Sequence, residues 1–312
     1  MFVNFVISIL AFAGIWVGSG FTIKSVERLS KTLKMSSFIV SFIVLGVFTS
    51  IGELSVGINS IIIDDPEIYV GNLIGASMVI FLFIIPILAI TGRSIRIAPE
   101  FRGFNLPATL VVIALPVLLS LDGRLGRNDS LIVFILFAIM LFSLHGKRGL
   151  VEHHIRISND AGIKASKDLI RIIFGVAIIF IGSRFVVEQT IYFSNLFNIS
   201  PFLISLLVIS IGTNIPEISL VIRSIFMRNK QVAFGNYMGS ASFNTFLLGG
   251  LTFAYGKPVL LQNSYVVSLL FLIVGLILFY LFAKTKHEIS RAEGFVLLIL
   301  YVLFIMAEIV MH

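Results

Sequence analysis

Apolar segments of about 20 residues recur along the whole chain, the length that crosses the hydrocarbon core of a bilayer as an α-helix. Transmembrane β-strands are shorter and alternate apolar with polar residues, a pattern that these segments lack. We therefore expect an all-α membrane protein with ten transmembrane helices. The segments cover residues 2–20, 36–62, 68–90, 104–121, 130–145, 169–188, 199–226, 232–254, 264–283 and 291–311.

The composition excludes a water-soluble fold. Of the 312 residues, 58% are apolar and only 12% are charged, about half the charged share of a soluble domain. The chain has no cysteine, which excludes disulfides and thiolate metal sites. The net charge of +7 comes mainly from loop residues, so it predicts an orientation in a lipid bilayer rather than nucleic-acid binding. Segment 2–20 lacks a basic start and a small-residue cleavage site, so we expect a retained helix rather than a signal peptide.

Basic residues alternate between the two sides of the predicted membrane. The loops after the first, third, fifth, seventh and ninth segments hold most of the 23 lysines and arginines. The loops on the other side hold Arg124, Arg127 and Lys257. Because basic loops stay in the cytoplasm, both termini are expected on the extracellular side of a cell membrane.

The two halves of the chain resemble each other in sequence. Sliding the sequence by 164 residues, a shift called the repeat offset below, brings TSIGELSVGINSI (49–61) onto TNIPEISLVIRSI (213–225). The same shift brings GNLIGAS (71–77) onto GNYMGSA (235–241) without a gap. Apolar composition alone does not align Thr, Glu, Gly and Asn in register, so the halves are internal repeats.

The repeats predict how the chain is organised in the membrane. Residues 1–145 and 169–312 each hold five segments, an odd number, so the second half enters the membrane from the opposite side. Such inverted repeats are typical of secondary transporters. The polar stretch 146–168 is then a cytoplasmic linker between two five-helix repeats. SVERLSKTLK (25–34) is expected to be an interfacial helix, and Arg184 is expected to snorkel or to pair with Glu188.

Two glutamates occupy equivalent positions in the second and seventh segments. In an inverted repeat they can approach each other near the midplane, where paired carboxylates repel unless a proton or a cation joins them. Oxygen-bearing side chains lie near them in sequence and on the eighth segment, and such oxygens are ligands of hard cations such as Ca²⁺ and Na⁺. The predicted metal ligands are Glu53, Glu217, Thr49, Thr213, Ser50, Asn214, Ser240 and Asn244.

Gly52 and Pro216 directly precede the two glutamates. Both residue types interrupt helices, so the second and seventh helices are expected to be discontinuous and to free backbone carbonyls toward a polar cavity. The GN-x-x-G elements at 71–75 and 235–239 have small faces that would pack closely on the broken helices. Asn72 and Asn236 could bond freed backbone groups, and we expect them to serve in packing and hydrogen bonding rather than to bind an ion.

GTNIPE (212–217) followed by GNYMGSASFN (235–244) resembles the α-repeat signature of the calcium/cation antiporter superfamily, which includes the sodium/calcium exchangers. FTSIGE (48–53) followed by GNLIGASMVI (71–80) is similar but diverges from the signature. The resemblance implies a five-plus-five-helix fold in which the two glutamates bind Ca²⁺. It also implies that flanking hydroxyls and carbonyls complete Ca²⁺ and Na⁺ sites, and that alternating access exchanges the ions.

The first repeat departs from that signature at several positions. Ala76 stands where the family has Ser, Ile80 where it has a polar side chain, and Gly52 where it has Pro. The second repeat keeps Ser240 and Asn244 at the corresponding positions. We expect a divalent centre to remain and at least one flanking monovalent site to be altered, which leaves the counter-ion and the stoichiometry open.

The sequence thus predicts a secondary antiporter that exchanges Ca²⁺ for Na⁺, works as a monomer, needs no cofactor and is not an enzyme. A proton-coupled antiporter for Ca²⁺ or another cation is the alternative. An intramembrane hydrolase is disfavoured because the sequence has no H-E-x-x-H motif and no histidine at the centre of a segment. A channel is disfavoured because single-chain inverted repeats with broken helices are typical of alternating access.

Overall fold

The computed structural model describes residues 1–32, 42–44, 46–101, 103–145, 159–218, 230–262 and 265–311, and almost all of them are helical. Short π-helical turns, η2 (Ile80–Ile84) and η5 (Ser205–Ile209), join α4 to α5 and α9 to α10. The short 3-10 turns are η3 (Pro99–Phe101) and η4 (Ser120–Asp122). The α-helices are α1 (Phe2–Thr32), α2 (Gly46–Thr49), α3 (Ile51–Ile62), α4 (Glu67–Val79), α5 (Ile85–Thr91), α6 (Asn105–Leu119), α7 (Arg127–His145), α8 (Asn159–Phe197), α9 (Pro201–Ile204), α10 (Ser210–Thr213), α12 (Lys230–Tyr255), α13 (Val266–Lys286) and α14 (Arg291–Met311).

The helices identify a multi-pass membrane protein. Within the described residues, seven helices are long and apolar enough to cross a bilayer, or up to eight if the bent pair α2 and α3 forms one span. Every segment predicted from the sequence contains helix, although 36–62 and 199–226 extend outside the described residues. Most of the expected linker 146–168 also lies outside them. In its described part, the expected interfacial helix 25–34 is a continuation of α1, because α1 runs without a break to Thr32.

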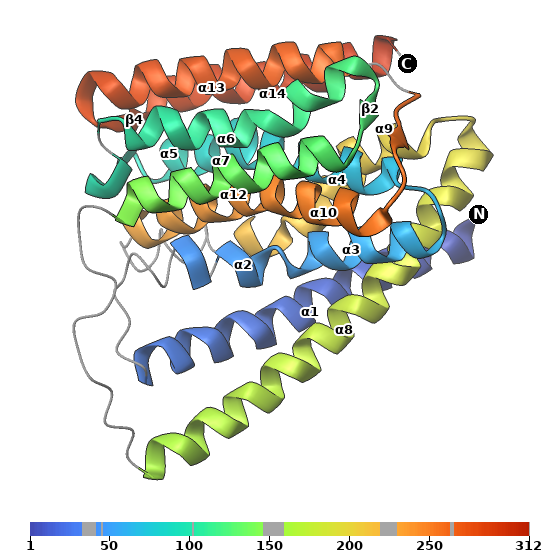
Figure 1. Cartoon of the computed structure of the whole chain (residues 1–312), viewed down its shortest axis with the longest axis horizontal. Coiled ribbons are helices and arrows are strands. Elements are labelled where there is room, and N and C mark those ends of the chain that lie inside the picture. The colour runs from blue at the N-terminus through green and yellow to red at the C-terminus, as the bar shows by residue number, and fades with distance from the viewer. Residues whose placement is uncertain are drawn as a thin grey trace.

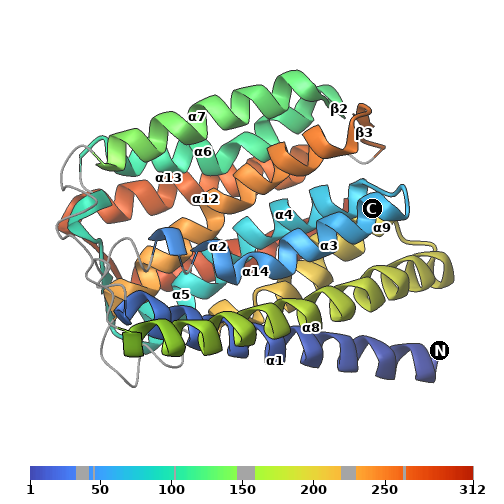
Figure 2. The same ribbon diagram turned by 60° about the horizontal axis from the view of Figure 1, so that its bottom comes forward.

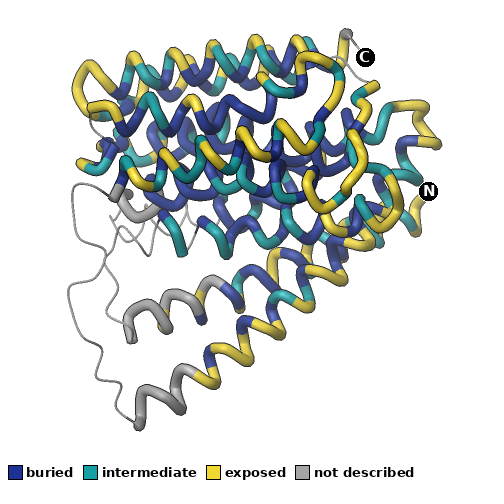
Figure 3. The backbone as a smooth tube through the Cα atoms, viewed as in Figure 1, coloured by how far each residue is buried: buried dark blue, intermediate teal, exposed yellow. Residues whose placement is uncertain are grey.

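Two helices from opposite halves of the chain lie along one side of the bundle. Figures 1 and 2 show α1 and α8 side by side and running in opposite directions, and α1 makes its most extensive contacts with α8. Figure 3 shows exposed positions along the outer sides of the bundle. Exposed apolar side chains on α1, α8, α13 and α14 include those of Leu10, Ile170, Ile277 and Val310. Such apolar faces are expected on helices that contact lipid.

α4 and α12 lie at the centre of the molecule and hold the broken helices. α4 packs against α3, α9, η5 and α10, while α12 packs against α2, α3, α6 and α7. η2 accommodates Pro86, which lacks an N–H group and would clash with the carbonyl group of Leu82 in a regular helix. The equivalent position in α12 is Gly250, and that helix continues without a π-turn.

Glycines of the GN-x-x-G elements allow the central helices to touch the broken ones. A Cβ atom at Gly75 would collide with the carbonyl oxygen of Leu206, and one at Gly239 would collide with the carbonyl oxygen of Phe42. The predicted close approach is therefore confirmed, and each element contacts the broken helix of the other half. The repeat offset converts the first of these contacts into the second.

Two short β-ribbons connect the halves of the chain. β1 (Ser94–Arg96) pairs antiparallel with β4 (Glu288–Ser290), and β2 (Arg124–Leu125) pairs antiparallel with β3 (Val259–Leu260). The repeat offset converts the pair Arg96 and Glu288 into Leu260 and Arg124, which are partners in the second ribbon. The ribbons lie at opposite ends of the molecule, near β4 and β2 in Figure 1. Each ribbon thus pairs a strand of the first half with a strand of the second half, in an equivalent register.

Candidate cation site

The second and seventh predicted helices break at equivalent residues. α2 ends at Thr49, Ser50 has φ −81° and ψ 10°, and α3 begins at Ile51. α10 ends at Thr213, Asn214 has φ −86° and ψ 8°, and residues 215–218 are helical again. The predicted discontinuity is confirmed, and its backbone geometry is nearly the same in both halves.

The break lies two residues before the position that glycine and proline suggested. Ser50 Oγ donates to Gly46 O at 3.0 Å, and Asn214 Nδ2 donates to Ser210 O at 2.7 Å. These side chains compete with backbone N–H groups for the carbonyls one turn back, which weakens the helix there. Pro216 instead falls in the first turn of the restarting helix, where its missing N–H costs no hydrogen bond.

The two predicted glutamates face each other across the breaks. Glu53 and Glu217 are both fully buried, and their carboxylates interact electrostatically. Thr213 interacts with the carboxylate of Glu53, and Thr49 with that of Glu217, so each glutamate meets the threonine of the other half. Two buried carboxylates at close range repel, so the pair requires a compensating positive charge or a proton.

Glu217 has hydrogen-bond donors in the described structure. Ser240 Oγ donates to Glu217 Oε1 at 3.1 Å and lies 3.0 Å from Ser50 Oγ. Tyr237 donates its hydroxyl to the backbone oxygen of Glu217 at 3.2 Å. Tyr237 was not among the predicted site residues, although its place inside GNYMGS was a signal that could have identified it. The fully buried Asn244 lies four residues after Ser240, on the same face of α12.

Several buried acceptors at the breaks lack hydrogen bonds. Within the described part of the chain, both carboxylate oxygens of Glu53, Glu217 Oε2 and Asn214 Oδ1 accept no hydrogen bond of normal geometry. Each buried acceptor without a donor costs about 1–3 kcal/mol, and a charged one costs more. A hard cation is the ligand that a cluster of acceptors without donors fits. No group of three or more His, Asp and Glu side chains forms among the described residues, so neutral oxygens would supply the remaining ligands.

The asparagines of the GN-x-x-G elements are buried and differ in their hydrogen bonding. Asn72 Oδ1 accepts a hydrogen bond from Thr213 Oγ1 at 3.3 Å, rather than bonding a freed backbone group. Both amide atoms of Asn236 lack partners within the described residues. A hydrogen-bonding role is therefore seen for Asn72, while the carbonyls near the breaks are bonded by Ser50 and Asn214. Asn72 instead holds the hydroxyl of Thr213.

The site is asymmetric although its backbone is nearly symmetric. Ser240 contacts Glu217 and Ser50. The repeat offset places Ala76 at the position of Ser240, Glu53 at that of Glu217, and Asn214 at that of Ser50. Because alanine donates no hydrogen bond, Glu53 and Asn214 lack the contact that Ser240 gives to Glu217 and Ser50, and their side-chain oxygens have no hydrogen-bond partner of normal geometry within the described residues. The divergence of the first repeat therefore has a direct structural consequence.

These features define a class of membrane protein. The chain is a multi-pass membrane protein with two broken helices whose ends bring two buried carboxylates and several neutral oxygens together. Intramembrane acids at the ends of broken helices are typical of proteins that bind ions within the bilayer.

The chain belongs to the sodium/calcium exchanger protein family, whose sequence profile matches residues 3–145 and 167–310. It is 25% identical to the sodium/calcium exchanger MaX1 of Methanosarcina acetivorans, over 97% of each chain. It is also 25% identical to the inner membrane protein YrbG of Escherichia coli, over 93% of this chain and 94% of YrbG.

Solved structures share the fold. The sodium-calcium exchanger NCX_Mj aligns with a TM-score of 0.70 and 22% identity, over 97% of each chain. The H⁺/Ca²⁺ exchanger CAX aligns with a TM-score of 0.77 and 14% identity, over 98% of this chain and 86% of the other. At these identities the similarity concerns the fold alone. The two similar structures are an exchanger named for sodium and calcium and an exchanger named for protons and calcium.

Proposed function

We propose that this protein is a secondary active antiporter that exchanges Ca²⁺ for Na⁺ across a cell membrane by alternating access. The observation that carries the proposal is the pair of fully buried glutamates, Glu53 and Glu217, at equivalent helix breaks. Family membership supports it, as does the name of the relative from Methanosarcina acetivorans. In this proposal the protein has no enzymatic activity and no cofactor, and the ions are its cargo.

The eight predicted ligands are all buried, direct contacts connect Ser50, Ser240 and Glu217, and electrostatic interactions relate Glu217 to Glu53. Two carboxylates would balance the charge of one Ca²⁺, and hydroxyl and amide oxygens would complete its coordination. Na⁺ would compete for the same oxygens, which couples the two fluxes. The proposed ligands are Glu53, Glu217, Thr49, Thr213, Ser50, Asn214, Ser240 and Asn244.

An arrangement of ten spans in two inverted repeats, 1–145 and 169–312 joined by the cytoplasmic segment 146–168, fits the described helices. α1 and α8 are related by the repeat offset and run in opposite directions, as inversion requires (Figures 1 and 2). The marked N- and C-terminal ends lie at the same end of the bundle in Figure 1, which requires an even number of crossings. The loop charges then favour an extracellular position for both termini. We propose a monomer as the functional unit, because the site is complete within one chain.

Proton coupling is the second candidate function. The replacement of the repeat-equivalent serine by Ala76 and of the repeat-equivalent asparagine by Ile80 favours it, because the first half offers fewer oxygens to a monovalent metal ion. Both candidates use the same glutamates and differ only in the counter-ion.

Flux measurements on reconstituted protein test the proposal. Ca²⁺ uptake into liposomes is expected under an outward Na⁺ gradient, and Glu53→Gln or Glu217→Gln is expected to reduce it to background because each removes a charged ligand. Arg184→Gln, far from the glutamates in sequence and on the exposed surface of α8, is a control that should leave uptake unchanged. Uptake driven by a pH gradient without Na⁺ would support proton coupling. Undiminished uptake in both glutamate variants would overturn the proposed site.

A further inference from the structure

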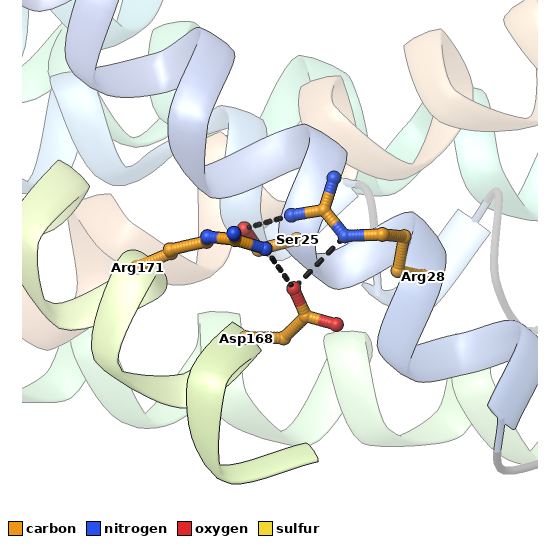
Figure 4. Close-up of polar contacts among 4 residues, drawn as sticks. All are labelled: Ser25, Arg28, Asp168 and Arg171. Atoms are coloured by element: carbon orange, nitrogen blue, oxygen red, sulfur yellow. Dashed lines mark hydrogen bonds and ion pairs between the residues drawn. The ribbon is translucent and has the colours of Figure 1, made fainter. Parts of the chain in front are cut away.

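Two arginines from α1 and α8 converge on one carboxylate oxygen (Figure 4). Arg28 Nε lies 2.9 Å from Asp168 Oδ1, and Arg171 Nη1 lies 3.2 Å from the same atom. Arg28 Nη2 also donates to Ser25 Oγ at 2.8 Å. The Asp168 side chain is 9% exposed, whereas those of Arg28 and Arg171 are 47% and 55% exposed. One largely buried anion thus holds two accessible guanidinium groups next to each other.

The carboxylate does not balance the positive charge around it. Lys24 and Lys167 are also exposed on the same stretches of α1 and α8. By sequence, residues 24–31 and 159–171 together carry six lysines and arginines against three aspartates and glutamates, which leaves an excess of three positive charges on these stretches. Within those residues Arg171 uses one of its N–H groups, so its other donors are available to a ligand.

This cluster lies at the boundary of the membrane. The apolar part of α1 ends at Thr22, and that of α8 begins at Ser166. Arg28 lies six residues beyond Thr22, about 9 Å along the helix, which is the depth of the lipid headgroups. Arg171 lies just inside the apolar part, from where a long side chain can reach the same depth.

Apolar side chains next to the arginines face outward. Ile170 is 66% exposed, and Ile173 and Phe174 are about equally exposed, on the turns of α8 adjacent to Arg171. Phe21 of α1 forms an edge contact with Phe174. A ligand bound by the guanidinium groups at this position therefore lies next to a surface suited to hydrocarbon chains.

We propose that Arg28 and Arg171 form a binding site for the phosphate headgroup of an anionic phospholipid. Paired guanidinium groups match the geometry of phosphate oxygens, and the excess positive charge selects lipids with net negative charge. The lipid would bridge the ends of α1 and α8, with its acyl chains along the exposed apolar residues of α8. This site is separate from the cation site, and its failure would leave the antiporter proposal intact.

The test compares lipids of different charge around the intact protein. The full chain in nanodiscs would be titrated with spin-labelled phosphatidylglycerol and spin-labelled phosphatidylcholine, and the bound fraction read from the immobilised component of the spectrum. The wild-type protein should prefer phosphatidylglycerol. Arg28→Gln and Arg171→Gln should each reduce that preference about fivefold, since one basic residue near the surface contributes about 1 kcal/mol.

Two further variants separate a lipid site from a salt bridge that only holds the helices together. Asp168→Asn removes the competing carboxylate, so the preference for phosphatidylglycerol should rise, whereas a purely structural cluster predicts lower thermal stability with no change in preference. Arg184→Gln is the matched control, because Arg184 pairs with Glu188 at 3.0 Å on the same helix, which is one of the two arrangements expected from the sequence. It should leave the preference unchanged.

Three results would overturn the proposal. The first is a preference that survives both arginine variants. The second is an equal loss in Arg184→Gln, which would indicate a diffuse charge effect. The third is displacement of the labelled lipid by excess inorganic phosphate, which would indicate a site for a free anion.

Discussion

Glu53 and Glu217 are equivalent in sequence but not in their surroundings. Glu217 accepts a hydrogen bond from Ser240, whereas both oxygens of Glu53 lack a donor of normal geometry among the described residues. The difference follows from one substitution between the repeats, because Ala76 takes the place that serine has at 240. The proposed ion site therefore has a half rich in oxygens, near Glu217, and a half poor in them, near Glu53.

Ala76→Ser tests whether this asymmetry affects ion selection. By equivalence with Ser240, the new hydroxyl should reach Glu53 and Asn214 and add an oxygen to the poorer half. We expect the Na⁺ concentration that halves Ca²⁺ binding to fall by about two- to tenfold, since such an interaction is worth roughly 0.5–1.5 kcal/mol. The measurement is Na⁺ competition against radioactive Ca²⁺ on purified protein.

Ala241→Ser is the matched control for that substitution. The repeat offset relates Ala241 to Ser77, whose hydroxyl donates to the Leu73 carbonyl at 3.2 Å. The control should therefore bond its own helix and leave Na⁺ competition unchanged. An equal shift in both variants would show that the hydroxyl at 76 does not act through Glu53.

At the scale of elements, the repeats share their contacts as well as their motifs. The helix breaks, the β-ribbons and the glycine contacts of α4 and α12 all convert into one another by the repeat offset. Each central helix packs on the broken helix of the other half. The geometry of the site therefore depends on packing between the halves, not on either half alone.

Gly75→Ala and Gly239→Ala test this dependence. In each variant the added methyl group meets a backbone carbonyl oxygen, Leu206 O or Phe42 O, which cannot move without shifting a helix. We expect each to lower the free energy of unfolding by about 1–3 kcal/mol. The measurement is the thermal unfolding midpoint in detergent.

Gly250→Ala provides the comparison on the same helix as Gly239. A Cβ atom at Gly250 meets no atom within 4 Å, so this substitution should be neutral or stabilise α12 by up to about 1 kcal/mol. Similar destabilisation in all three variants would contradict the role of close approach.

The sequence was sufficient to predict apolar membrane helices and two glutamates beside helix breaks, because charges and helix breakers are conspicuous in apolar segments. It was insufficient to place the breaks, since these depend on Ser50 and Asn214 competing for carbonyls rather than on Gly52 and Pro216. The β-ribbons were missed because strands of two or three residues carry no readable periodicity. The role of Asn72 depends on contacts between the halves, which no local pattern contains.

At the scale of the whole molecule, the chain divides into a central bundle and the pair α1 and α8 along one side (Figure 2). The ribbon of β1 and β4 joins the end of α5 to the turn between α13 and α14. The ribbon of β2 and β3 joins the turn between α6 and α7 to the turn between α12 and α13, so the central bundle is connected at both ends. The α1 and α8 pair stands outside these connections.

Labelling of single cysteines tests the proposed topology. The chain has no native cysteine, so each introduced thiol is the only one present. Cysteines at positions 3 and 310 should react with a membrane-impermeant maleimide added to intact cells, whereas one at position 150 should react only after permeabilisation. Labelling of the two terminal positions from opposite sides would contradict an even number of crossings.

Equilibrium binding of radioactive Ca²⁺ to the purified protein tests most directly whether Glu53 and Glu217 form one cation site. We expect one saturable site per chain that Na⁺ displaces and that is lost in Glu53→Gln and in Glu217→Gln, while thermal stability without Ca²⁺ is retained. Loss in both variants would show that the halves build a single site together. Ca²⁺ binding that persists unchanged when either glutamate is replaced would contradict the account.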